Sequence, residues 1–123
     1  MIDHISLRVS DLEKSKKFYI AILKPVGYAL ESEYPDACGF RGEDGTSVWL
    51  IKENYVTKGV HVAFLGKDLK AVHFFHALGL STGGIDNGAP GPRKEYREDY
   101  FGAFLLDFDD NNIEAVYYSD KHS

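Results

Sequence analysis

The sequence contains an internal repeat, and this repeat constrains the fold more than any other feature. The segment HISLRVSDLEKSKKFY, which begins at His4, aligns without a gap on HVAFLGKDLKAVHFFH, which begins at His61. A histidine leads each copy, and Phe18 in the first copy matches Phe75 in the second. A repeat unit of this size buries its apolar side against a neighbouring unit. We therefore expect two similar units within one domain.

Each copy passes from a strand pattern to a helical one. Residues 4–9 and 60–65 alternate between two kinds of side chain, which predicts a strand with two different faces in each copy. Apolar residues at helical spacing follow in both copies. The segment SDLE, residues 10–13, resembles a capping box and predicts the start of the first helix. Gly79 is expected to end the second helix with a positive φ.

Further strands are predicted over 28–34, 37–41 and 46–52 in the first half, and over 100–106 and 112–118 in the second half. A glycine- and proline-rich loop is expected at 83–92, and Asp109, Asp110 and Asn111 should form the last turn. The predicted fold class is α+β, with two tandem β-α-β-β-β modules that form a cupped mixed sheet and carry helices on its outer face. The chain is expected to be one domain, 1–123, with modules of about 1–55 and 58–123.

Three side chains are expected on the inner surface of this cup. Because the apolar strand faces turn toward the helices, His4 and His61 should point inward, and alternation in NNIEAVYY places Glu114 with them. An inward carboxylate is costly unless it is paired, and a cation would remove that cost. Two imidazoles and one carboxylate leave open coordination positions and suit Fe(II), Mn, Zn or Ni. The alternative is a hydrogen-bonded His-Glu-His cluster without metal.

The segment GAPGPRKEYREDYFG predicts an irregular loop over the rim of the cup. Arg93 could bind a carboxylate or phosphate, and Tyr96 could bind a hydroxyl group. Tyr100 is a candidate both for substrate binding and for proton transfer, and Trp49 is a further candidate for the lining of the cup. An ordinary solvated rim is the alternative for each of them.

Composition excludes several classes of function. The formal net charge of −5 argues against binding to nucleic acid, because such proteins concentrate basic residues on one face. No apolar run is long enough for a membrane span, and the N-terminus lacks the features of a signal peptide, so a cytoplasmic protein is expected. The single cysteine, Cys38, allows no intrachain disulfide. His73 and His76 are expected on the surface of the second helix, and His122 in an exposed tail.

The sequence resembles the vicinal oxygen chelate superfamily, which includes glyoxalase I, extradiol dioxygenases and the fosfomycin and bleomycin resistance proteins. The resemblance rests on DHISLRVSDLEKSKKFY, GVHVAF, GAPGPRKEY and YFGAFLLDFDDNNIEAV, and it covers nearly the whole chain. It implies a metal inside the cup, with His4, His61 and Glu114 as ligands. Glyoxalase I has a fourth ligand where this sequence has Val48 or Trp49, which argues against glyoxalase I activity itself.

The resemblance implies a metal-dependent enzyme of the glyoxalase or dioxygenase type, either a lyase or isomerase or a dioxygenase. Its small-molecule substrate would bind the metal through two adjacent oxygens. It also implies a homodimer, which in some members builds each cup from modules of two chains. The alternative function is a metal-free protein that binds and sequesters a small, antibiotic-like molecule.

Overall fold

The computed structural model describes residues 1–120, so the tail residue His122 lies outside the described residues. Its elements, in chain order, are β1 (His4–Val9), α1 (Leu12–Leu23), β2 (Tyr28–Tyr34), β3 (Ala37–Gly42), β4 (Ser47–Lys52), β5 (His61–Leu65), α2 (Leu69–Ser81), β6 (Ile85–Pro92), β7 (Tyr100–Leu106) and β8 (Asn112–Tyr118).

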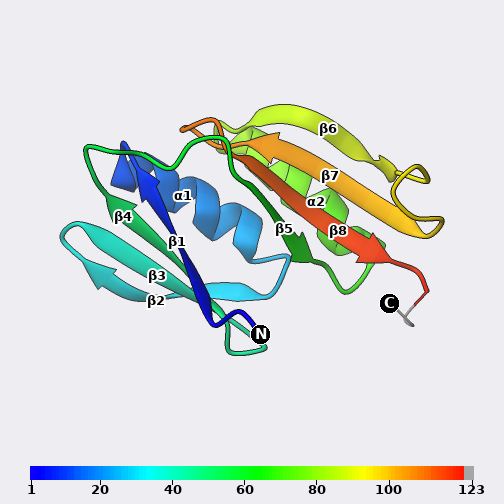
Figure 1. Cartoon of the computed structure of the whole chain (residues 1–123), viewed down its shortest axis with the longest axis horizontal. Helices are drawn as coiled ribbons and strands as arrows, with labels where there is room; N and C mark the ends of the chain where they lie inside the picture. Colours follow the sequence, from blue (N-terminus) through cyan, green and yellow to red (C-terminus); the bar gives the residue numbers. More distant parts are fainter. Residues whose placement is uncertain (121–123) are drawn as a thin grey trace.

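The chain forms two four-stranded mixed sheets, with strand orders β1-β4-β3-β2 and β5-β8-β7-β6. In each sheet the first strand of the module pairs in parallel with the last, and the other pairs are antiparallel. The sheets lie side by side, and both helices lie behind them in the view of Figure 1. The predicted fold class of two tandem β-α-β-β-β modules is confirmed.

The two helices begin in the same way. Asp11 caps α1 by accepting a hydrogen bond from the backbone of Lys14, and Asp68 caps α2 by accepting one from Ala71. The cap of α1 is thus one residue later than the capping box predicted. Alternation in β1 places Leu7 in the buried core.

The segment expected to be a loop at 83–92 contains β6, which was missed. This strand lies at the edge of its sheet, and its pairing with β7 shifts register on both sides of Gly88. An edge strand tolerates Pro90 and Pro92, because the missing N–H groups can face away from the neighbouring strand. Proline content therefore concealed the strand in the sequence.

Gly79 is required for packing and not for a positive φ, contrary to the sequence prediction. Helix α2 continues to Ser81, and a Cβ at Gly79 would lie 2.2 Å from Leu105 Cδ1. We expect Gly79→Ala to lower the free energy of unfolding by about 1 to 3 kcal/mol because of overpacking. Urea unfolding would measure this loss, with the exposed Lys70→Ala on the same helix as a control. A Gly79→Ala protein as stable as the parent would contradict the packing argument.

A buried polar turn joins the second module to the first. It is the β7–β8 turn, Asp107–Asn111. Asp107 accepts a hydrogen bond of 2.6 Å from Tyr19 Oη on α1, and Asp109 accepts one of 2.6 Å from Ser10 Oγ. Its Asn111 side chain also donates to the backbone oxygen of Thr57 at 2.7 Å. The turn therefore fixes both α1 and the segment between the modules.

Strands β1 and β5 each lie at the end of their own sheet, and they do not pair with each other. They also run in opposite directions: β1 starts near the N-terminus at the bottom of Figure 1, whereas β5 starts near the top. Each module therefore has one unpaired edge on its first strand. Neither helix among residues 1–120 is long and apolar enough to cross a membrane.

Candidate functional site

His61 and Glu114 meet on the face of the second sheet that points away from α2. His61 begins β5, Glu114 lies in the middle of the adjacent strand β8, and their atoms Nε2 and Oε1 are 2.7 Å apart. The side chain of Glu114 is fully buried, whereas that of His61 is 53% exposed. The pair thus combines a carboxylate removed from water with an imidazole that solvent can reach.

Tyr100, at the start of β7, donates its hydroxyl to the other carboxylate oxygen of Glu114. Burial, and after it the hydrogen bond to Glu114, raises the pKa of the Tyr100 phenol well above its ordinary value of 10.0. The phenol therefore stays protonated and acts as a donor. A Cβ at Gly102 would lie 3.0 Å from Glu114 Oε2, so glycine at this position leaves room for the carboxylate.

His4 does not join this cluster within one chain. It begins β1 on the other sheet, where its side chain is 56% exposed and its Nδ1 lies 2.8 Å from Asp3 Oδ1. Among residues 1–120, no three side chains of the metal-binding types are grouped closely enough to hold an ion. One chain thus brings together two of the three predicted ligands.

Trp49 occupies the position in the first module that Glu114 occupies in the second. In the parallel strand pairs, His4 lies opposite Ser47 in β4, and His61 lies opposite Asn112 in β8. Trp49 and Glu114, each two residues after that partner, therefore hold equivalent positions. The Trp49 ring stacks on Tyr34 with centroids 6.3 Å apart. Val48 is buried in the core. Of the two residues considered for a fourth ligand, Trp49 is therefore the counterpart, and indole does not bind metal.

Arg93 lies on the same face as His61 and Glu114, next to Phe104, which was not predicted as a site residue. Its guanidinium lies 5.4 Å from the centre of the Phe104 ring, and that ring lies 6.1 Å from the His61 ring. Alternation along YFGAF places Phe104 on one face with Tyr100, so the pattern could have revealed it. Tyr96 is exposed and packs edge-on against the Tyr100 ring.

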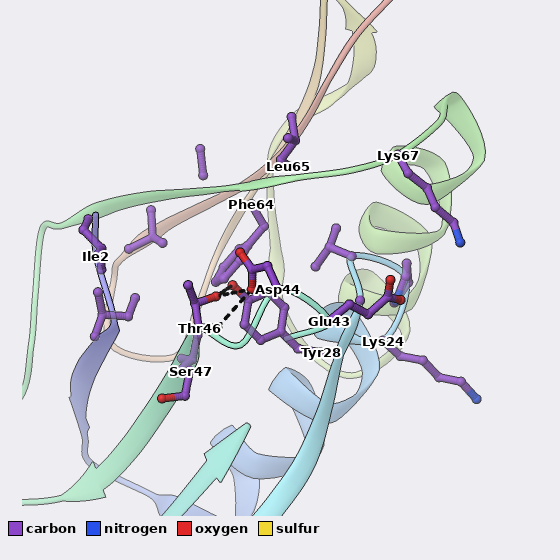
Figure 2. Close-up of a pocket in the computed structure, with 17 residues that line it drawn as sticks. Ile2, Lys24, Tyr28, Glu43, Asp44, Thr46, Ser47, Phe64, Leu65 and Lys67 are labelled. Atoms are coloured by element: carbon purple, nitrogen blue, oxygen red, sulfur yellow. Dashed lines mark hydrogen bonds between the residues drawn. The ribbon is translucent and has the colours of Figure 1, made fainter. Parts of the chain in front are cut away.

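A pocket of about 520 Å³ lies elsewhere, between the two modules. Figure 2 shows it beneath β5, with Phe64 and Leu65 on one side and Tyr28, Thr46 and Ser47 on the other. Its lining contains neither His61 nor Glu114. The pocket runs beside the unpaired edges of β1 and β5, and it is separate from the His61–Glu114 pair.

His76 is buried, contrary to the prediction of two surface histidines on α2, whereas His73 is exposed. The ring atom His76 Nε2 lies 2.9 Å from Asp86 Oδ1 on β6. A hydrogen bond from the backbone of Gly88 and the contact with His76 lower the pKa of Asp86. His76 therefore ties α2 to the edge strand and belongs to the core.

The two modules and the buried carboxylate define a class of cup-shaped β-α-β-β-β proteins. The model of the Glyoxalase/Bleomycin resistance protein/Dioxygenase superfamily matches residues 1–118. The chain belongs to this superfamily. No curated protein shows significant similarity to the sequence.

Solved structures agree with this assignment. A glyoxalase/bleomycin resistance protein from Albidiferax ferrireducens T118 is 28% identical, with a TM-score of 0.85 over 95% of this chain and 98% of that one. A genomically encoded fosfomycin resistance protein from Listeria monocytogenes is 18% identical, with a TM-score of 0.74 over 97% of this chain and 93% of that one. A family enzyme from Burkholderia phytofirmans PsJN is 12% identical, with a TM-score of 0.74 over 94% of this chain and 97% of that one. The last two likenesses concern the fold alone.

Proposed function

We propose that this protein is a metal-dependent enzyme of the glyoxalase or dioxygenase type that acts on a small substrate through two adjacent oxygens. The observation that carries the proposal is the environment of Glu114. Its carboxylate is fully buried, and its side-chain partners are one imidazole and one protonated phenol. A buried carboxylate without a cationic partner is expensive, and a bound cation would offset that expense.

The donor set fits a divalent metal such as Fe(II), Mn, Zn or Ni. Imidazole nitrogen and carboxylate oxygen are the ligand types that these ions share. His61 Nε2 and Glu114 Oε1 already lie side by side at 2.7 Å. Tyr100 holds the second carboxylate oxygen, so Glu114 would offer one oxygen to the ion. His61 and Glu114 would thus supply two of three protein ligands.

His4 would supply the third ligand from a second copy of the chain. Both β1 and β5 have an unpaired edge, and such edges favour pairing with another strand. Ile2, just before β1, and Leu65, at the end of β5, are 70% and 67% exposed. A homodimer that pairs these edges would cover both residues and bring the exposed His4 of one chain toward the His61 of the other.

The residues of this chain have distinct roles in the proposed reaction. A bound divalent ion would act as a Lewis acid toward two adjacent substrate oxygens. Tyr100 fixes the orientation of Glu114 and keeps its own proton at neutral pH, because its pKa is raised. The exposed side of the His61 ring, and Phe104 beside it, would contact the substrate. Trp49, on the other sheet, would form the opposite wall of a cup built from two chains.

Mixing two metal-deficient variants tests both the ligands and the shared site. His4→Ala and His61→Ala should each lose metal, measured by elemental mass spectrometry after reconstitution. When the two are unfolded and refolded together, half of the dimers are mixed, and each mixed dimer has one complete site out of two. Metal content should therefore return to about one quarter of the parent value.

A site within one chain predicts a different result, because every chain in the mixture would still lack one ligand. No recovery of metal in the mixture would then contradict the shared site. The exposed His73→Ala should bind metal like the parent and serves as the control.

A metal-free binding protein is the second candidate, and one observation favours it. His61 and Tyr100 already give both oxygens of Glu114 a hydrogen-bond partner. A parent protein that binds no metal after reconstitution with Fe(II), Mn, Ni and Zn would support this candidate and contradict the metal-dependent enzyme.

A further inference from the structure

We infer that Arg93 forms an oxyanion-binding site on the same face as His61 and Glu114, so that the substrate carries a carboxylate or phosphate group. That this anion is part of a substrate rests on the proposed function. The anion site itself rests only on the contacts of Arg93, which are independent of any metal.

The Arg93 guanidinium is held in one orientation. Its Nη2 donates to the backbone oxygen of Ala89 at 2.8 Å, and its Nη1 donates to that of Pro92 at 3.2 Å. The group lies 5.4 Å from the centre of the Phe104 ring. An arginine that is stacked on an aromatic ring and tied to two carbonyls has already lost much of its side-chain freedom, so a ligand would not have to order it.

Two glycines make the space in which the guanidinium lies. A Cβ at Gly88 would be 3.3 Å from Arg93 Nη2, and a Cβ at Gly91 would be 3.1 Å from Nη1. Both distances are tighter than ordinary van der Waals contact. A Cβ at either position would therefore displace the guanidinium by a few tenths of an ångström.

The charge of Arg93 is not neutralised within residues 1–120. Arg41 and Arg97 each pair with a carboxylate at 2.6 Å, whereas Arg93 forms no ion pair in this part of the chain. Two backbone carbonyls occupy two of its five N–H donors, which leaves three. A planar guanidinium with several available donors suits the oxygens of a carboxylate or phosphate.

Phe104 connects this site to the candidate metal centre. It pairs with Glu114 across β7 and β8, and its ring lies 6.1 Å from the His61 ring. One small molecule could therefore place an anionic group at Arg93 and an apolar part over Phe104, with its remaining oxygens toward His61. Neutral molecules of the same shape would lose the contact with Arg93.

Solution NMR on the ¹⁵N-labelled full chain, in the presence of EDTA, tests this inference without metal. The probes are benzoate, phenyl phosphate and the neutral benzamide. We expect the two anions to shift the Arg93 side-chain Nε–H resonance and benzamide to bind at least about tenfold more weakly. The comparison of benzoate with phenyl phosphate identifies which oxyanion the site prefers.

Three variants sharpen the test. Arg93→Gln should weaken binding of the preferred anion by about tenfold or more, because it removes a charge-assisted contact. Gly91→Ala keeps the arginine but displaces it, so it should weaken binding by a smaller factor. Arg8→Gln, an exposed arginine on the other sheet, should bind like the parent. A well-dispersed spectrum confirms that each variant is folded.

Equal binding of benzamide and the anions, no binding of either anion, or unchanged binding in Arg93→Gln would each overturn the inference. These outcomes are distinct from a failure of the proposed function. Metal binding without an anion site would contradict the role of Arg93 and leave the enzyme proposal unchanged. An anion site in a protein that never binds metal would support the role of Arg93 and contradict the metal-dependent enzyme.

Discussion

Glu114→Gln should abolish metal binding while leaving the folded structure intact. The glutamine side chain has nearly the same shape, and it can accept the Tyr100 hydroxyl and donate to His61 Nε2, so the hydrogen bonds of the buried group are kept. A neutral amide is a much weaker ligand than a carboxylate for these metals. Metal content should therefore fall from about one ion per chain to near zero.

Elemental mass spectrometry measures the metal, and urea unfolding in EDTA measures the stability of the metal-free protein. In EDTA the variant should be as stable as the parent or more stable, because it no longer buries a charge. His73→Gln replaces an exposed imidazole on α2, far from the candidate ligands in the sequence, and should alter neither quantity. Retention of a full equivalent of metal by Glu114→Gln would mean that the ion is bound elsewhere.

Asp107→Ala should cause the largest loss of stability in the β7–β8 turn. The Asp107 carboxylate is buried and accepts hydrogen bonds from Tyr19 Oη, the backbone N–H groups of Asp109 and Asn111, and Asn111 Nδ2. Alanine would leave the Tyr19 hydroxyl and the two backbone N–H groups without this acceptor, and Asn111 Nδ2 would keep only its bond to the Thr57 backbone oxygen. We expect the free energy of unfolding to fall by about 3 to 5 kcal/mol, because each buried donor left without an acceptor costs roughly 1 to 3 kcal/mol.

Two further variants distinguish the turn from a general effect of losing an aspartate. Tyr19→Phe removes only one of the bonds and should cost about 1 kcal/mol. Asp44 lies in the matching turn of the first module, is exposed and accepts hydrogen bonds from nearby Thr46, so Asp44→Ala should have a much smaller effect. Urea unfolding would measure these losses. If Asp107→Ala and Asp44→Ala lowered the free energy of unfolding by similar amounts, the β7–β8 turn would not join the modules in the way argued above.

The repeat made most of the fold predictable. Matching His4 with His61 revealed two copies of one unit, and period-2 alternation placed Glu114 on the same face as His61. Both inferences depend on local geometry, which a sequence carries directly. Strand β6 was missed because its prolines contradict a strand unless the strand lies at an edge, and edge position is decided by the whole sheet.

The site was only partly predictable for the same reason. Alternation identifies the face of a strand but not the residues that meet on it, so the bond from Tyr100 to Glu114 and the position of Phe104 beside His61 required the structure. Gly79 shows a related limit, because its role depends on Leu105, far away in the sequence. The separation of His4 from the other two candidates depends on how the modules pack, which no local pattern encodes.

The correspondence between Trp49 and Glu114 means that the approximate twofold symmetry of the chain is broken at one chemically decisive place. Both modules present a histidine at the start of the first strand, but only one presents a carboxylate beside it. Duplicated halves of this kind are free to specialise, because one copy can keep an inherited chemistry while the other changes. Here the second half carries the acidic group, and the first carries a flat indole ring at the matching position.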